Sequence, residues 1–180
     1  MSTFLAVLLT VIYPLTIWLA EGRIEPRVLA GVLLLAGFAR LFSVQISQAT
    51  RWWMGATMLL VLLAVWGNAM FPLKLYPVIV NGTLLGVFAY SLIVPPSAIE
   101  RIARMRDPHL PAPAIGYTRR VTQVWCVFFF ANGAIALYTA LYASSALWSL
   151  YNGFLAYILV GLLFAGEYCI RRRVMGRQHG

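Results

Sequence analysis

The sequence is short of charge, and of acidic charge most of all. Only 11% of its 180 residues are charged, and 5 acidic residues stand against 14 lysines and arginines. Soluble domains carry about a quarter charged residues. A domain of this size cannot bury a composition that is 62% hydrophobic, because too much of a small domain is surface. Together with a mean hydropathy of +0.82, this excludes a soluble globular protein and indicates an integral membrane protein.

Metal ligands and reactive side chains are also scarce. The chain has 2 cysteines and 2 histidines. Cys126 and Cys169 lie inside apolar runs, where thiols usually pack as small hydrophobic groups. Four metal ligands do not occur at a useful spacing for zinc, and there is no glycine-rich phosphate loop or serine elbow. We therefore expect no metal, no cofactor and a non-catalytic role.

What the sequence has is long apolar runs. A helix needs ~20 residues to cross a bilayer, with ~17 as the lower limit. The runs are continuous, whereas a transmembrane barrel would show alternation. They predict one all-α domain over 1–180, a polytopic helix bundle of six spans, or of five if the short second segment does not cross. The segments are 4–20, 28–44, 52–71, 76–94, 121–143 and 147–170. No basic residue precedes the first, so we expect a retained helix rather than a cleaved signal peptide.

The basic residues between these segments predict the orientation. With both termini in the cytoplasm, eleven lysines and arginines fall on the cytoplasmic side and three on the other. Short cytoplasmic connections carry an excess of Lys and Arg. Six spans with both termini cytoplasmic satisfy this rule, and the loop 95–120 is then the main cytoplasmic connection. With five spans the N-terminus would move outside.

This loop contains the features of a short helix. Ser97 and Glu100 have the spacing of a capping box. Ile99, Ile102 and Ala103 would share one face of the helix that follows, which predicts an amphipathic helix lying on the inner leaflet. Further along, Pro108, Pro111 and Pro113 predict a stiff, extended connection that lasts until helix resumes near Arg119.

The arginines of the loop form a candidate contact surface. Each basic residue near anionic lipid contributes ~1 kcal/mol. A membrane-tethered loop of this kind fits lipid headgroups and topology better than nucleic acid. We expect contact with the anionic inner leaflet, and with other membrane proteins, through Arg101, Arg104, Arg106, Arg119 and Arg120.

Polar residues also occur at membrane depth. Asn81, Asn132 and Asn152 are each followed by glycine. A turn there would leave backbone groups unpaired in lipid, so we interpret each pair as part of a helix. The glycine then allows a neighbouring helix to approach and the asparagine bonds across the contact. The alternative is that the three asparagines and Glu167 converge on one cavity, as in a small lipid or precursor transporter.

Three further patterns carry hypotheses. Glu167 precedes Arg171 by four residues, which favours an interfacial ion pair over proton transfer. Gly82 and Gly86 form a small-xxx-small face that suits a homo-oligomer. A membrane enzyme acting on acyl chains would need His109 within hydrogen-bond reach of Cys126.

The C-terminal half resembles the intracellular septation protein A family of bacterial inner-membrane proteins. The resemblance begins near Ile99 and rests on Leu110-Pro111, Arg119-Arg120, Trp125, Phe128-Phe129, Gly133, Leu137-Tyr138 and Trp148. It implies a bacterial inner-membrane location and a non-catalytic role in septation or envelope biogenesis. The chain is also similar to small membrane proteins that accompany polyene or fatty-acid synthesis genes, which implies an accessory role in lipid chemistry. Neither group supplies a catalytic residue.

Overall fold

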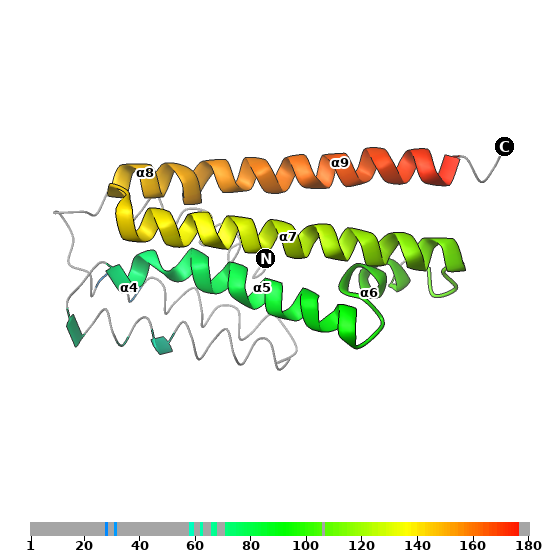
Figure 1. Ribbon diagram of the computed structural model, residues 1–180, viewed down its shortest axis with the longest axis horizontal. Helices are drawn as coiled ribbons and strands as arrows, with labels where there is room; N and C mark the ends of the chain where they lie inside the picture. Colours follow the sequence, from blue (N-terminus) through cyan, green and yellow to red (C-terminus); the bar gives the residue numbers. More distant parts are fainter. Residues whose placement is uncertain are drawn as a thin grey trace.

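The computed structural model describes residues 71–105 and 107–176, together with the single positions 28, 31, 58, 59, 62, 66 and 67 (Figure 1). Beyond residue 171 it describes the backbone only. The segments predicted at 4–20, 28–44 and 52–71 lie outside these residues, apart from single positions. The count of six spans and the position of the N-terminus therefore stay predictions.

The continuous ranges that the structure describes are helical and contain no strand, which confirms the all-α prediction for this part of the chain. Three of their stretches are long and apolar enough to cross a membrane: Phe71–Ile93, Ala112–Tyr142 and Ser145–Arg171. The elements are α4 (Phe71–Lys74), α5 (Tyr76–Ile93), α6 (Ala98–Arg104), α7 (Ala112–Tyr142), α8 (Ser145–Leu150), the π-helix η1 (Tyr151–Leu155) and α9 (Ala156–Gly176).

Figure 1 shows α5 and α7 lying side by side, with α9 along the other side of α7. Short connections make consecutive long helices antiparallel. One end of the bundle, which we call the basic end, therefore gathers the end of α5, α6, the start of α7 and the end of α9. The opposite end holds α4 and α8. There the Trp148 indole N–H donates to the Lys74 carbonyl at 3.2 Å, and the Lys74 ammonium donates to the Ser145 hydroxyl.

Aromatic side chains form the contact between the helices. Phe129 of α7 packs edge-on against Phe88 of α5, with ring centroids 5.1 Å apart. Trp125, one turn earlier in α7, lies 4.7 Å from the Phe164 ring of α9. Trp125 and Phe129 are both buried. The outer surface of α9 is apolar and exposed, including Ile158 and Leu159, which is the pattern of a helix that faces lipid.

Proline sets two helix boundaries, one as predicted and one not. Val94 adopts an extended conformation at the end of α5, as residues before proline prefer. Helix α7 begins at Ala112, well before the predicted restart near Arg119, with Pro111 as its N-cap. The prediction that Pro113 belongs to an extended connection is wrong. Pro113 sits in the first helical turn, where the missing N–H costs no hydrogen bond and the fixed φ suits a helix.

Candidate functional site

The buried asparagines form one candidate site, between α5, α7 and η1. Asn132 Nδ2 donates to Asn81 Oδ1 at 3.0 Å, and the Tyr151 hydroxyl donates to Asn132 Oδ1 at 2.8 Å. The Asn81 and Asn132 side chains are buried. The chain Tyr151–Asn132–Asn81 therefore links three helical segments through side-chain hydrogen bonds alone.

Local sequence explains how α5 and α7 approach closely enough for this contact. A Cβ atom on Gly133 would lie 3.2 Å from the Asn81 Cβ, tighter than ordinary contact, so only glycine fits there without a shift. Asn81 Nδ2 also donates to the Pro77 carbonyl at 2.8 Å, which fixes its orientation. The predicted use of an Asn-Gly pair at a helix contact is therefore found at Asn132-Gly133.

The π-helix brings the third asparagine to the same interface. Asn152 Nδ2 donates to Thr139 Oγ1 of α7 at 3.2 Å and to the Trp148 carbonyl at 2.9 Å. Successive residues of an α-helix point about 100° apart. The wider π-turn reduces that angle, so the neighbouring Tyr151 and Asn152 both reach α7. Single π-turns of this kind are often found at functional sites.

All three asparagines line one cavity of about 180 Å³. Its other walls are mainly apolar, from Val80, Phe128 and Val160 among others. Glu167 is not among its lining residues. The structure thus brings together three of the four groups that the transporter hypothesis needs, and their amides bond mainly to one another and to their own helices.

Glu167 lines a second, larger groove near the basic end, between α7 and α9. The Tyr117 hydroxyl lies 3.2 Å from the Glu167 carbonyl and 3.4 Å from Oε1, and donates to them. Arg171 Nε lies 4.0 Å from Oε1, so the predicted ion pair forms, although loosely. The groove has a volume of about 410 Å³ and is lined by Tyr117, Arg120, Val121, Val124, Trp125, Leu162, Leu163, Gly166, Glu167 and Ile170.

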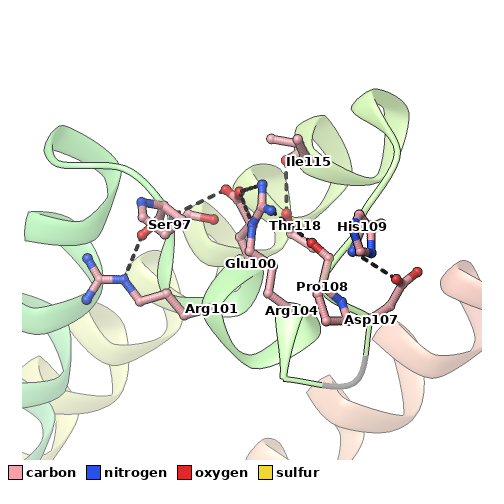
Figure 2. Close-up of polar contacts among 10 residues, drawn as sticks. Ser97, Glu100, Arg101, Arg104, Asp107, Pro108, His109, Ile115 and Thr118 are labelled. Atoms are coloured by element: carbon pink, nitrogen blue, oxygen red, sulfur yellow. Dashed lines mark hydrogen bonds and ion pairs between the residues drawn. The ribbon is translucent and has the colours of Figure 1, made fainter.

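The arginines of the loop divide into two groups. Arg104 Nε and Nη2 donate to Glu100 Oε1 at 2.9 and 2.8 Å, and Nη1 donates to the Pro108 carbonyl at 3.3 Å (Figure 2). Arg101 donates to the Pro96 carbonyl at 2.9 Å and the Val94 carbonyl at 3.5 Å. These two arginines therefore hold the connection between α5 and α7 in shape.

The second group is exposed. Within the ranges that the structure describes, no hydrogen bond or ion pair occupies Arg119 or Arg120. Arg106 lies outside the described residues. Of the four loop arginines that the structure describes, the two that are free to bind something else are consequently Arg119 and Arg120.

Helix α6 is capped by residues that the sequence pattern did not reveal. The residues of the predicted capping box stand in their expected places, with Ser97 at the N-cap and Glu100 at the third helical position. In its Glu100 half, the Ser97 N–H donates to Glu100 Oε2 at 3.4 Å, whereas the buried Ser97 hydroxyl makes no hydrogen bond with the described residues. Instead, the Ala98 N–H donates to Ser91 Oγ at 2.8 Å and the Ile99 N–H to Thr122 Oγ1 at 3.3 Å. No local pattern identifies these caps, since they come from α5 and α7.

The predicted apolar face of α6 is only partly turned outward. Ile102 is 54% exposed, and Met105, just after the helix, is 78% exposed, whereas Glu100 is only 6% exposed. The helix therefore rests on α7 through a polar face. Its exposed apolar residues are free to contact a bilayer.

The catalytic alternative requires His109 to lie within hydrogen-bond reach of Cys126, and the described structure shows no such contact. His109 is exposed, and its backbone N–H donates to Asp107 Oδ1 at 3.0 Å. No hydrogen bond joins it to Cys126 in the described part of the chain, where no group of three His, Cys, Asp or Glu side chains is placed to hold a metal. Comparison with protein families, curated proteins and solved structures found no match for this chain.

Proposed function

We propose that this chain is a multi-pass protein of the bacterial inner membrane that acts without catalysis. Its basic end would contact anionic lipid headgroups and other proteins of the cell envelope. The observation that carries this proposal is the exposed Arg119-Arg120 pair, which makes no hydrogen bond or ion pair with the residues that the structure describes. The pair lies at one end of a bundle in which three described helices are long and apolar enough to cross a membrane. Guanidinium groups form paired hydrogen bonds with phosphate, so a lipid surface suits them.

Two further features support a contact function. The buried asparagines bond within the bundle, as groups do that hold helices together. The exposed Ile102 and Met105 lie at the same end as the arginines, which gives that end the mixed apolar and basic surface that binds a membrane interface. The resemblance of the C-terminal half to septation protein A supports an envelope role.

The test is a charge reversal limited to the free pair. Arg119→Glu/Arg120→Glu should lower the amount of anionic lipid that copurifies with the protein and weaken its photo-crosslinks to membrane partners. Arg119→Lys/Arg120→Lys keeps the charge and serves as the matched control. If the reversal leaves both lipid and crosslinks unchanged while the protein stays in the membrane, the proposal is wrong.

A small lipid or precursor transporter is a second candidate, favoured by the convergence of Asn81, Asn132 and Asn152 on one cavity. Ligand pockets usually measure about 300–1,000 Å³, so the cavity of about 180 Å³ would have to widen. Transport into vesicles that survives replacement of all three asparagines by leucine would remove this candidate.

An accessory role in polyene or fatty-acid synthesis is a variant of the contact function with a different partner. The gene neighbourhood separates the two. Division genes beside the coding sequence would favour an envelope role, whereas acyl-carrier and ketosynthase-like genes would favour lipid synthesis.

A further inference from the structure

We propose that the groove between α7 and α9 binds a single phospholipid, with an acyl chain between the helices and the phosphate at Arg120. This inference rests on the proposed function and narrows it, because it assigns one bound molecule to a site with named walls. The groove volume of about 410 Å³ falls in the range of about 300–1,000 Å³ typical of ligand sites.

The inner part of the groove suits a hydrocarbon chain. Its walls are Val121, Val124 and Trp125 from α7, and Leu162 and Leu163 from α9. The two helices both have the length and apolar character of membrane spans. A gap between such helices opens toward lipid tails rather than toward water, so the expected occupant of an apolar gap is an acyl chain.

Two contacts join α7 and α9 along the groove. The Trp125 and Phe164 rings meet with centroids 4.7 Å apart, and the Tyr117 hydroxyl bonds to Glu167 near the end. Gly166 lies beside Glu167 and lines the groove. A Cβ added to Gly166 meets no atom within 4 Å in the described structure, so the missing side chain leaves the groove unfilled.

The outer part of the groove suits a phosphate. Arg120 lines it and is exposed, and no hydrogen bond or ion pair occupies it in the ranges described. Glu167 already accepts from Tyr117 and pairs with Arg171, so the charge left over at the rim is positive. A second copy of the chain would bring the same positive rim against Arg120, whereas a phospholipid brings the opposite charge.

Three single variants test the site, one of them as a control. Gly166→Leu fills the groove, whereas Gly161→Leu adds the same side chain at an exposed position of α9 that does not line it. Arg120→Gln removes the phosphate partner. The measurement is native mass spectrometry of the full chain after delipidation and addition of phosphatidylglycerol.

The unchanged chain should retain one phosphatidylglycerol. Gly166→Leu should reduce retention to the background level. Arg120→Gln should weaken it about fivefold, the effect of one basic residue on anionic lipid, and the control variant Gly161→Leu should bind as the unchanged chain does. Diacylglycerol, which has tails but no phosphate, should be retained poorly by every variant.

Equal retention by Gly166→Leu and Gly161→Leu would overturn the proposal, as would retention of diacylglycerol equal to that of phosphatidylglycerol. A dimer that forms only without lipid and is lost in Gly166→Leu would also overturn it, because a second copy would then occupy the groove. The proposed function fails separately, if Arg119→Glu/Arg120→Glu alters neither copurified lipid nor crosslinks. If that reversal has its effect while Gly166→Leu retains lipid, only the groove site fails.

Discussion

Asn132 of α7 donates its amide hydrogen to Asn81 of α5 at 3.0 Å, and both side chains are buried at the contact between two membrane-length helices. An amide in hydrocarbon has no water to replace a lost partner. Asn132 therefore supplies the hydrogen-bond donor, and Asn81 supplies the acceptor, that the lipid cannot provide. The pair also fixes the register of α5 against α7, because a shift by one residue would separate the two amides.

The first prediction concerns the strength of this pair. In a double-mutant cycle of Asn81→Ala and Asn132→Ala, we expect a coupling energy of about 0.6–1.7 kcal/mol, the range for hydrogen bonds between membrane helices. Reversible unfolding in mixed micelles measures it. Asn152→Ala combined with Asn81→Ala is the control, since no hydrogen bond between these two residues is found. Equal coupling in both cycles would contradict a direct bond.

The second prediction concerns the close approach at Gly133. Gly133→Ala places a Cβ 3.2 Å from the Asn81 Cβ, and inserting a methyl group into a packed contact costs about 1–3 kcal/mol. Gly116→Ala on the same helix has open space around it and should leave the free energy of unfolding the same or slightly higher. Thermal unfolding in detergent compares the two. A Gly133→Ala protein as stable as the Gly116→Ala protein would show that the helices do not meet here.

The third prediction concerns the glycines that the sequence assigned to a homo-oligomer. Gly82 and Gly86 lie exposed, and a Cβ on either meets nothing within 4 Å among the described residues. Gly86→Leu should therefore keep the fold of the protomer and break an oligomer that uses this face. Crosslinking in membranes reports the oligomer. Dimers that persist at the same level in Gly82→Leu/Gly86→Leu would exclude this face as their contact.

The fourth prediction separates Arg104 from the free arginines. Arg104→Gln leaves the buried Glu100 carboxylate without its charged partner. Hydrogen bonds to charged groups contribute about 1.5–3 kcal/mol. Because 39% of the Arg104 side chain is exposed, water screens the pair and we expect about 1 kcal/mol of destabilisation. Arg119→Gln should leave the free energy of unfolding unchanged. A larger loss from Arg119→Gln than from Arg104→Gln would reverse the roles assigned here.

The fifth prediction follows from the Ser97 hydroxyl, which is buried and has no hydrogen-bond partner among the described residues. An N-cap serine usually contributes about 1 kcal/mol. Here Ser97→Ala should cost less than that, because it removes a group whose hydration was lost without compensation. Ser91→Ala is the comparison, since Ser91 caps the Ala98 N–H. The same unfolding assay should show Ser91→Ala as the more damaging change.

Sequence reasoning found the elements that depend on local pattern. The apolar run 76–94 corresponds to α5, and the Ser97–Glu100 spacing located the start of α6. The spacing of Glu167 and Arg171 predicted an ion pair that the structure contains. Each of these rests on residues a few positions apart, where helix geometry alone sets the distance.

What it missed depends on contacts that no local pattern encodes. Helices α5 and α7 are apolar on most sides, so composition does not tell which face pairs, and the meeting of Asn81 with Asn132 stayed one of two alternatives. The π-turn at Tyr151 has no sequence signature. Ser91 and Thr122 cap α6 from other helices. The sequence also does not separate the bound arginines from the free ones, because Arg101 is held by backbone carbonyls whose positions only the structure shows.

We propose that Arg119 and Arg120, the exposed arginines at the basic end, contact lipid phosphate. Solid-state NMR tests it most directly, through dephasing of the ¹³C signal of the arginine Cζ atoms by lipid ³¹P in phosphatidylglycerol bilayers. The difference between the unchanged chain and Arg119→Gln/Arg120→Gln isolates the two signals. We expect lipid phosphorus to dephase these signals. Signals that persist undiminished would show that Arg119 and Arg120 do not meet the membrane and would contradict this proposal.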